Sequence, residues 1–336
     1  MVKTLITGAG LVGCHVAQKL VEMGQRPILF DVAPEVNYIA SVVPLDKVTI
    51  VIGDITDISD LVRAIQSEKI EQVVHTAFML TSPSTERPLA GVRVNIGGTS
   101  NVLEAARLMG VRKVVFTSSM AIYCRTSIRE TKGPYTEDMA FKSTSERLTS
   151  IYAVTKLTCE HLGLAYYDLY SLDFIALRVA GIFGPCKTKG IGGFNTVLIR
   201  DIIDAALSGK ALTLERPPGW PIPREFVYVK DVAGAIVKAC SGGYLESRVY
   251  NIGSAKFYDF PEVVKIARRV FPGAAIKAKE GEWTHPMSVG SGWHYDLPQP
   301  IDITLAQREL GYVPEYDMEK AITDFGNWVM KYDQPQ

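Results

Sequence analysis

The chain has 336 residues, of which 47% are hydrophobic and 21% charged, a composition typical of a globular protein with a large core. Lys plus Arg and Asp plus Glu number 36 each, so the formal net charge is zero and gives no reason to expect nucleic acid or an anionic membrane as a partner. The longest apolar runs have the length of strands, which argues against a membrane span.

The five cysteines lie far apart and form no CxxC pair, which is typical of reduced thiols in a cytoplasmic protein. The chain does not open on a basic segment followed by a cleavable apolar stretch, and this also favours a cytoplasmic location. The histidines and cysteines have no metal-ligand spacing, so no metal site is expected.

The first part of the chain predicts strand, glycine turn, helix and strand in succession. Residues 2–6 are a short apolar run, residues 11–23 have amphipathic helical spacing, and residues 27–30 are a second apolar run ending on Asp31. The turn at residues 8–13 reads Gly-x-Gly-x-x-Gly, and the acid follows about 20 residues later, the pattern of a dinucleotide-binding unit. Such a turn could also serve only to pack a helix on a sheet, but its position and Asp31 favour nucleotide binding.

Each residue type in the turn has a physical reason. Gly8 permits the tight turn, Gly10 lets the backbone approach a pyrophosphate, and Gly13 lets the helix lie close to the strand. The free N–H groups of the first helical turn, including those of Leu11 and Val12, would then face the phosphates.

Asp31 also indicates which dinucleotide is bound. Its carboxylate can accept hydrogen bonds from two ribose hydroxyls and would repel a 2′-phosphate. The next residues, Val32 and Ala33, supply no cation to bind that phosphate. The sequence therefore predicts NAD rather than NADP as the cofactor.

Strands and helices continue to alternate up to residue 180. Apolar runs predict strands at residues 48–52, 73–77, 113–118 and 173–179, and helices around residues 61–65, 95–109 and 152–170. Residues 78–93 contain Pro83 and Pro88 and are expected to form a loop over the carboxyl end of the sheet. The alternation predicts an α/β fold of the Rossmann type, with helices covering both faces of a doubly wound parallel sheet.

The pattern becomes irregular beyond residue 180. Short strands are expected at residues 226–229 and 249–252, and helices at residues 196–207, 232–239, 261–270, 306–310 and 318–330. We expect residues 1–180, joined by about 224–254, to form the NAD-binding domain, and residues 181–223 and 255–336 to form a smaller, irregular α/β part that binds substrate. This part should lie over the carboxyl edge of the sheet, where ligands bind in such folds.

A second motif, YAVTK at residues 152–156, points to the chemistry. Tyr152 and Lys156 are four residues apart on a helix and share one face, where the ammonium can lower the pKa of the phenol. A phenol tuned in this way can exchange a proton with an alcohol or carbonyl while hydride moves to or from a nicotinamide. Ser118 and Ser119 end the preceding strand, where a hydroxyl can hydrogen-bond the same oxygen. The spacing alone is common by chance, so its weight comes from the dinucleotide fold before it.

The chain resembles the extended branch of the short-chain dehydrogenase/reductase superfamily, the group of NAD-dependent epimerases and dehydratases. The resemblance covers nearly the whole chain and is carried by TGAGLVG, Asp31, GDI at residues 53–55, VVHTA, VNIGGT, FTSSMAIY, YAVTK, LRVAGIFGP, REFVYVKDVA, YNIGS and RELGY. It implies a homodimer in which the helix after Asn95 and the helix of Tyr152 pack against their symmetry mates.

The resemblance also implies residue roles for the cofactor and the reaction. Ser119 would be the catalytic hydroxyl and Tyr152 the acid/base, while Lys156 would hold the nicotinamide ribose and lower the pKa of the tyrosine. Asp31 would bind the adenosine ribose. The remaining cofactor contacts would come from Asp54 and Ile55 at the adenine and from Ala77.

Other roles concern the substrate and the support of the sheet. Substrate contacts are expected from Thr81, Ser119, Gly181, Phe183 and Arg224. Arg224 matches a family arginine that contacts a substrate diphosphate, although a salt bridge to Glu225 or Asp231 is its alternative role. Asn95 is expected mainly to support the sheet from the start of its helix.

Several positions depart from the family pattern. The glycine motif is one residue shorter than the usual TGxxGxxG, and YAVTK replaces the more frequent YGxSK while keeping both reacting groups. Gly181 stands where nucleotide-sugar epimerases typically have a substrate-binding Asn, residues 216–223 (RPPGWPIP) replace a short glycine-bearing turn, and Lys230 replaces an Asp. These changes fall where a nucleotide diphosphate would lie. We therefore expect a small sugar-like, polyol or hydroxy-acid substrate.

The sequence thus predicts an NAD-dependent oxidoreductase that transfers hydride between NAD and a secondary alcohol or ketone. A nucleotide-sugar epimerase or dehydratase with transiently reduced NAD is the alternative, and an NAD-sensing protein without catalysis is a remote one. His75 lies centrally in a strand and is expected to be a core residue. The segment between Trp283 and Trp293, with His285 and His294 beside it, could close over substrate or pack on the surface.

Overall fold

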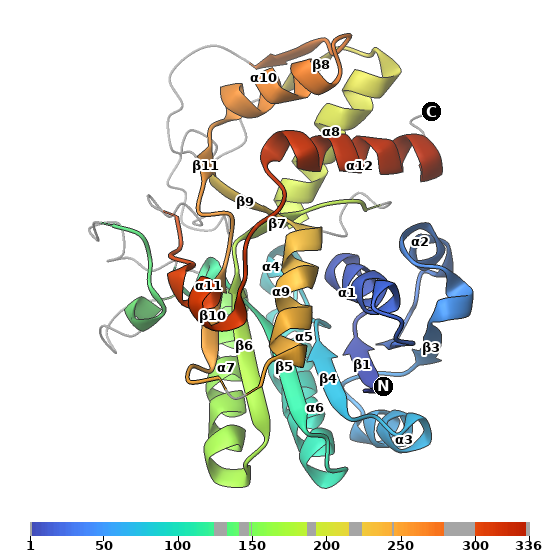
Figure 1. Cartoon of the computed structure of the whole chain (residues 1–336), viewed down its shortest axis with the longest axis vertical. Coiled ribbons are helices and arrows are strands. Elements are labelled where there is room, and N and C mark those ends of the chain that lie inside the picture. Colours follow the sequence, from blue (N-terminus) through green and yellow to red (C-terminus); the bar gives the residue numbers. More distant parts are fainter. Residues whose placement is uncertain are drawn as a thin grey trace.

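Seven parallel strands form the central sheet of the computed structural model, which describes residues 2–123, 133–140, 148, 150–186, 193–214, 224–243, 245–278 and 300–333 (Figure 1). The strands lie in the order β10-β6-β5-β4-β1-β2-β3, and every pairing is parallel. Their bounds are β1 Thr4–Thr7, β2 Ile28–Asp31, β3 Thr49–Ile52, β4 Gln72–His75, β5 Lys113–Ser119, β6 Asp173–Val179 and β10 Val249–Ile252. The predicted doubly wound parallel sheet is confirmed.

Both faces of this sheet are buried, which explains why its strands are nearly continuous apolar runs. Alternate residues, such as Ile6 and Val74, belong to one hydrophobic cluster, and their neighbours Leu5 and Val73 belong to another. Helices α1 (Leu11–Glu22) and α9 (Val229–Ser241) pack beside each other on the first face. The second face is covered by α3 (Ile58–Glu68), α6 (Gly98–Leu108) and α7 (Ile151–Tyr170).

The sheet has its topological switch point between β1 and β4. Strands β2 and β3 lie on one side of β1, whereas β4, β5, β6 and β10 lie on the other. The segments that follow β1 and β4 therefore leave toward opposite faces, and ligands bind in the resulting crevice of such folds. The glycine turn directly follows β1, so the fold places it at this point.

A smaller and less regular part continues the structure beyond the carboxyl edge of the sheet, at the top of Figure 1. It contains a three-stranded sheet, β11-β9-β7, and a two-stranded sheet, β12-β8. The strands are β7 Gly181–Phe183, β8 Leu212–Leu214, β9 Arg224–Tyr228, β11 Phe257–Tyr258 and β12 Ile276–Ala278, and the packed helices are α8 Gly193–Ser208, α10 Phe260–Val270 and α12 Met318–Tyr332. Helix α11, Thr304–Leu310, contacts β10 instead.

The segment expected to return to the NAD-binding domain, residues 224–254, contributes to both parts. Its strand β10 joins the large sheet, and α9 packs on that sheet. Its first strand, β9, pairs with β7 and β11 in the smaller sheet. The division into an NAD-binding and a substrate-binding part stays a prediction.

The prediction of a loop at residues 78–93 was wrong. Helices α4 (Thr81–Glu86) and α5 (Pro88–Val92) occupy most of it, and a π-helical turn (Arg93–Gly97) joins them to α6. Pro83 and Pro88 both lie in the first turn of a helix, where the missing N–H group has no helical partner to lose. Helix α2, Val36–Val42, lies between β2 and β3.

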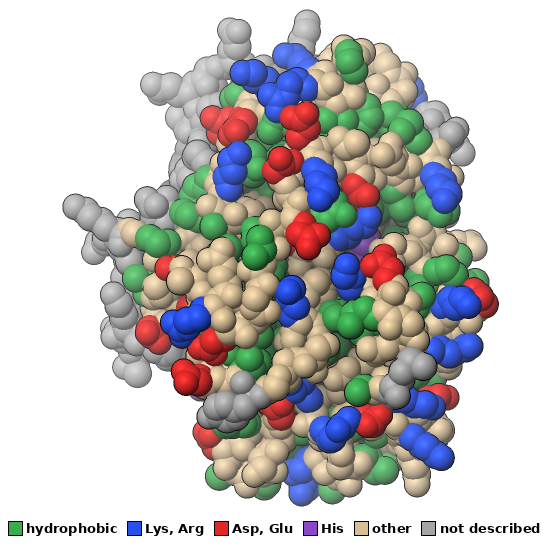
Figure 2. All heavy atoms as spheres, in the orientation of Figure 1, with side chains coloured by type: hydrophobic (Ala, Val, Ile, Leu, Met, Phe, Trp, Pro, Cys, Tyr) green, Lys and Arg blue, Asp and Glu red, His purple; other side chains and the backbone are tan. Residues whose placement is uncertain are grey.

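Positive and negative side chains are interspersed over the face of the molecule shown in Figure 2, in line with the balanced composition. Within the described part of the chain, no helix combines the length and the apolar character needed to cross a bilayer.

Candidate active site

The glycine turn between β1 and α1 is held so tightly that two of its three glycines cannot be replaced without movement. Gly8 has a φ of +89° and donates its N–H to the carbonyl of Phe30 at 2.8 Å. A Cβ on Gly8 would lie 2.8 Å from the backbone nitrogen of Ala77, and one on Gly13 would lie 1.9 Å from the carbonyl oxygen of Gly8. The expected roles of these glycines as turn and packing residues thus have a steric basis.

Gly10 differs from its neighbours because a Cβ there would meet no described atom within 4 Å. Packing within the protein therefore gives no reason for this glycine, whereas close approach of a ligand does. Gly10 is also the N-cap residue of α1, and no side chain in the described residues caps this helix. Its first-turn N–H groups, including those of Leu11 and Val12, therefore suit an anionic group such as a pyrophosphate.

Asp31 at the end of β2 is fixed next to this turn. Its two carboxylate oxygens accept hydrogen bonds from the N–H groups of Ala9 at 2.8 Å and Ala33 at 2.9 Å. Each oxygen keeps a second lone pair, and the side chain is partly exposed. The carboxylate is thus oriented by the protein and can still accept ribose hydroxyls.

The other predicted cofactor residues also lie at this edge of the sheet. Asp54 and Ile55 follow β3, where the Asp54 carboxylate accepts the N–H of Thr56 at 2.8 Å and the carbonyl of Ile55 accepts the side-chain amide of Asn101 at 3.0 Å. Ala77 follows β4 and borders Gly8. Their contacts with a cofactor stay predictions.

Lys156 is buried beneath the carboxyl end of β5. Only 3% of the residue is exposed, and its Nζ donates a hydrogen bond to the carbonyl of Thr117 at 2.5 Å. Burial lowers the pKa of Lys156 to about 7, while Cys159 and Glu160 oppose that shift. The ammonium lies 3.4 Å from the ring centroid of Phe78 and 4.6 Å from that of Phe116.

Tyr152 and Ser119 belong to two elements that are in contact, since Tyr152 lies on α7 and Ser119 ends β5. Helix α7 begins at Ile151 because the Ser150 hydroxyl caps it, accepting the N–H of Ala153 at 3.1 Å. Tyr152 is therefore in the first turn, one turn before Lys156, and stays partly exposed. Ser119 ends β5, and its Oγ accepts the N–H of Ala121 at 3.2 Å.

The neighbouring Ser118 provides a second test of the site. Its Oγ is buried and has no hydrogen-bond partner in the described part of the chain. Buried hydroxyls are normally satisfied, so this atom is suited to a polar group supplied from outside the chain. Together with the open space at Gly10, it indicates that the residues present fit a dinucleotide.

Comparison with known proteins agrees with this geometry. The family model described as "NAD dependent epimerase/dehydratase family" matches residues 4–253. The chain belongs to the NAD-dependent epimerase/dehydratase family. The family recognised from the sequence motifs is thereby confirmed, and so is its dependence on NAD.

Individual relatives include epimerases and a dehydrogenase. UDP-glucuronate 4-epimerase 2 of Arabidopsis thaliana is 28% identical over 98% of this chain and 76% of its own length. The crystal structure of Thermus thermophilus UDP-glucose 4-epimerase in complex with NAD has a TM-score of 0.78 and 25% identity, covering 98% of this chain and 99% of that one. The L-threonine dehydrogenase of Clostridium difficile shares the fold, with a TM-score of 0.80, 22% identity and 98% coverage of both chains.

Two other polar residues of the family motifs have structural roles here. His75 is buried between the hydroxyls of Thr7 at 2.6 Å and Thr99 at 3.0 Å, and burial lowers its pKa to about 3, so it is a neutral core residue as expected. The Asn95 side chain accepts the N–H of Met79 at 2.7 Å and donates to the Thr155 hydroxyl at 3.1 Å. Asn95 thus connects the segment after β4 to the helix of Tyr152.

The structure describes only some of the residues that were predicted to contact the substrate. Thr81 begins α4 and Gly181 begins β7, and both are partly exposed. Phe183 is 1% exposed and packs against Phe226 and Tyr228, which favours a core role over a substrate contact. The Arg224 side chain lies outside the described residues, as do residues 216–223, His285, His294 and the segment from Trp283 to Trp293.

Sequence reasoning missed a buried polar network behind the site. Arg178 of β6 forms hydrogen bonds of 2.8–3.1 Å with the Glu160 carboxylate of α7 and donates to the hydroxyl of Tyr123 at 3.0 Å. Tyr123 in turn donates to Asn251 at 2.7 Å. The motifs contain Tyr123, Arg178 and Asn251 but not Glu160, and nothing in the sequence spacing predicts that the four residues meet.

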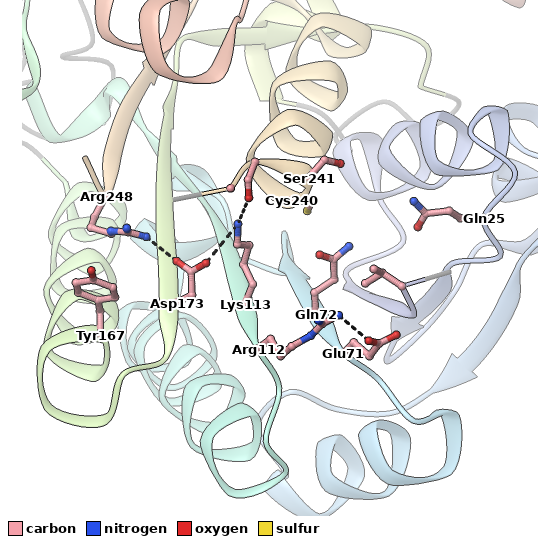
Figure 3. A pocket seen from close by; sticks show the side chains of 13 residues that line it. Gln25, Glu71, Gln72, Arg112, Lys113, Tyr167, Asp173, Cys240, Ser241 and Arg248 are labelled. Carbon is pink, nitrogen blue, oxygen red and sulfur yellow. Dashed lines mark hydrogen bonds and ion pairs between the residues drawn. The ribbon is translucent and has the colours of Figure 1, made fainter. Parts of the chain in front are cut away.

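The described part of the chain also has a surface pocket of about 620 Å³, which lies far from this site (Figure 3). It is at the amino ends of the strands, whereas Ser119 ends β5 at the carboxyl edge. Its charges pair with each other, because Asp173 contacts Lys113 at 3.3 Å and Arg248 at 2.6 Å. The pocket is therefore separate from the family's cofactor site.

Proposed function

We propose that this protein is an NAD-dependent oxidoreductase that transfers hydride between NAD and a secondary alcohol or ketone. The observation that supports the proposal most is the contact of α7 with β5, where Nζ of Lys156 donates to the carbonyl of Thr117, two residues before Ser119, and lies 5.7 Å from the ring centroid of Tyr152. The first turn of α1 would hold the pyrophosphate, and Asp31 would hold the adenosine ribose. Asp54, Ile55 and Ala77 would line the rest of the cofactor.

The proposed chemistry divides one reaction between three side chains. The bound NAD would supply the hydride acceptor. In oxidation, Tyr152 as phenolate would take the hydroxyl proton while Ser119 donates a hydrogen bond to the same oxygen. The charged Lys156 would favour the phenolate and hold the nicotinamide ribose. In reduction, the same Tyr152 would return the proton to the carbonyl oxygen.

The substrate we favour is a small sugar-like, polyol or hydroxy-acid compound. Gly181 offers no side chain to hold a sugar, and the RPPGWPIP segment at residues 216–223 replaces a glycine-bearing turn. Thr81, Ser119 and Arg224 would provide the polar contacts. L-Threonine dehydrogenase shows that the same fold can be associated with a small hydroxy-amino-acid substrate, but at 22% identity it speaks for the fold alone.

A nucleotide-sugar epimerase or dehydratase is the second candidate. It is favoured by the 28% identity to UDP-glucuronate 4-epimerase 2, which extends over 98% of this chain. The chemistry at Tyr152 would be the same, but NAD would be reduced and reoxidised within one cycle. A protein that only senses NAD is disfavoured, because Ser119, Tyr152 and Lys156 are all retained.

Incubation with NAD separates these candidates. The substrates are a panel of polyols, sugars and hydroxy acids on one side and UDP- and dTDP-sugars on the other, with NADH absorbance and product isomerisation followed in parallel. Net NADH from a small alcohol supports the dehydrogenase. Isomerisation or dehydration of a nucleotide sugar without net NADH would reject it in favour of the second candidate.

We also propose a cytoplasmic homodimer that forms through α6 and α7. Exposed apolar side chains on these helices include Leu108 (56% exposed), Val154 (43%) and Leu169 (72%), and Leu89 on the neighbouring α5 is 83% exposed. Exposed apolar side chains on neighbouring helices would suit an interface between copies. Light scattering of the wild type and of Leu169→Glu tests this, since only the wild type should have the mass of a dimer.

A further inference from the structure

Phe78 lies outside the catalytic motif and contacts both of its reacting residues. Its ring centroid lies 3.4 Å from Nζ of Lys156, a distance at which the ammonium sits on the face of the ring. The same ring meets Tyr152 edge-on, with centroids 5.7 Å apart and an interplanar angle of 89°. One side chain therefore touches both members of the YxxxK pair.

The electrostatic surroundings of Lys156 make this contact important. From its own helix, Cys159 and Glu160 face it, and from β4 the imidazole of His75 does. Burial raises the pKa of the Cys159 thiol to about 11, and His75 is neutral, so neither carries charge at neutral pH. Both oxygens of Glu160 accept hydrogen bonds from Arg178, which offsets that charge. The carbonyl oxygen of Thr117 accepts a hydrogen bond from Nζ of Lys156.

An ammonium that is 3% exposed needs compensation for the water it has lost. The negative face of an aromatic ring provides such compensation, and it does so most strongly where water is excluded. Phe116 adds a more distant face at 4.6 Å, but it is fully buried and stacks on His75 and Phe174, so it belongs to the core. Phe78 borders the same core, with its ring centroid 6.0 Å from that of Phe116, but it is partly exposed.

We propose that Phe78 is a positioning residue that keeps Lys156 charged and seated beside Tyr152 through the face-on contact of its ring. The inference rests on the proposed function, because a charged Lys156 matters only if Tyr152 acts as the acid/base. Without the ring, Lys156 loses its proton more readily. The neutral amine then no longer favours the phenolate of Tyr152, whose pKa rises.

The test compares Phe78→Leu, which keeps an apolar side chain but removes the aromatic ring, with Phe78→Tyr, which keeps an aromatic ring. The pKa of Lys156 is measured directly on ligand-free protein from the NMR shift of its ¹³C-labelled Cε, assigned with Lys156→Met. Phe78→Leu is expected to lower that pKa by about one unit, and Phe78→Tyr to leave it near the wild-type value.

Kinetics provide the second readout. For alcohol oxidation, the acid limb of the kcat profile should move to higher pH in Phe78→Leu, with kcat at neutral pH reduced about tenfold and the substrate KM nearly unchanged. A Lys156 pKa that is the same in Phe78→Leu and wild type would overturn the proposal. If Phe78→Leu binds NAD more tightly while the pKa of Lys156 is unchanged, the proposal is also overturned, because the ring would then only cover Lys156 sterically.

The two proposals fail in different ways. If Tyr152→Phe leaves the activity intact, the proposed function is wrong, whatever Phe78 does. If Tyr152→Phe abolishes activity while Phe78→Leu keeps the wild-type pKa of Lys156, only the role of Phe78 is wrong. Thermal unfolding of both Phe78 variants is compared with wild type, and the NMR titration is read on the folded protein in each case.

Discussion

Substitutions at two glycines of the turn should separate its effect on protein stability from its effect on cofactor binding. Gly13→Ala places a methyl group 1.9 Å from the carbonyl oxygen of Gly8, and both groups belong to rigid backbone. Relief requires α1 to move away from β1, and overpacking of this kind costs about 3 kcal/mol. Gly10→Ala places its methyl group in a space with no described atom within 4 Å, at a φ of −89° that alanine tolerates. Its cost to the ligand-free protein should stay below about 1 kcal/mol.

Gly10→Ala should weaken NAD binding although it hardly changes the stability of the ligand-free protein. If the pyrophosphate approaches this residue, its methyl group competes with the phosphate, and the dissociation constant should rise about 10- to 100-fold, or about 1.4–2.7 kcal/mol. Gly234→Ala is the matched control, since its methyl group also meets nothing within 4 Å but lies in α9.

Thermal unfolding without ligand and titration calorimetry with NAD measure the two quantities independently. Gly13→Ala should unfold at lower temperature than wild type. Gly10→Ala should unfold like wild type and gain far less stability from added NAD. Wild-type NAD affinity in Gly10→Ala, or wild-type stability in Gly13→Ala, would refute this account of the cradle.

Three further predictions follow from other contacts. Asp31→Asn should weaken NAD binding and reduce the discrimination against NADP, because one oxygen and the negative charge are lost; equal affinities of wild type and variant for both dinucleotides would refute the ribose contact. Glu160→Gln should destabilise the protein by about 3–5 kcal/mol in chemical denaturation, because it leaves Arg178 buried without its counter-charge. Glu104→Gln, which weakens a solvent-screened pair with Arg107, should destabilise it far less. Burial raises the pKa of Glu225 from 4.5 to about 7, so between these pH values the folded state holds a proton that the unfolded state releases. The free energy of unfolding of wild type relative to Glu225→Gln should therefore fall by about 3 kcal/mol between pH 4.5 and pH 8. A difference that does not change with pH would contradict this.

Sequence was a good guide wherever one local pattern determines one local structure. The strand at residues 173–179 was predicted with its observed bounds because its residues 174–177 are an apolar run that follows a helix. The glycine turn was predicted because its steric demands are local, as the contacts of Gly8 and Gly13 show. The predicted adjacency of Tyr152 and Lys156 follows from helical periodicity alone.

Sequence was a poor guide where distant residues decide. Residues 78–93 contain two prolines and few apolar residues, yet they form helices because those prolines lie in first turns and Asn95 binds the preceding segment at Met79. Phe78 had no distinguishing feature in the sequence. Its contact with Lys156 depends on how the segment after β4 packs against α7. Glu160 and Arg178 are 18 residues apart, and their pairing depends on the packing of α7 against β6.

The most direct test of the central claim is the turnover of Tyr152→Phe with the substrate that the panel identifies, measured at saturating NAD. We predict that kcat falls by about 10²–10⁴-fold while the dissociation constant of NAD stays close to that of wild type, because the variant loses a proton acceptor and keeps the cradle. Turnover near the wild-type rate would contradict the assignment of Tyr152 as the acid/base and, with it, the proposed reaction.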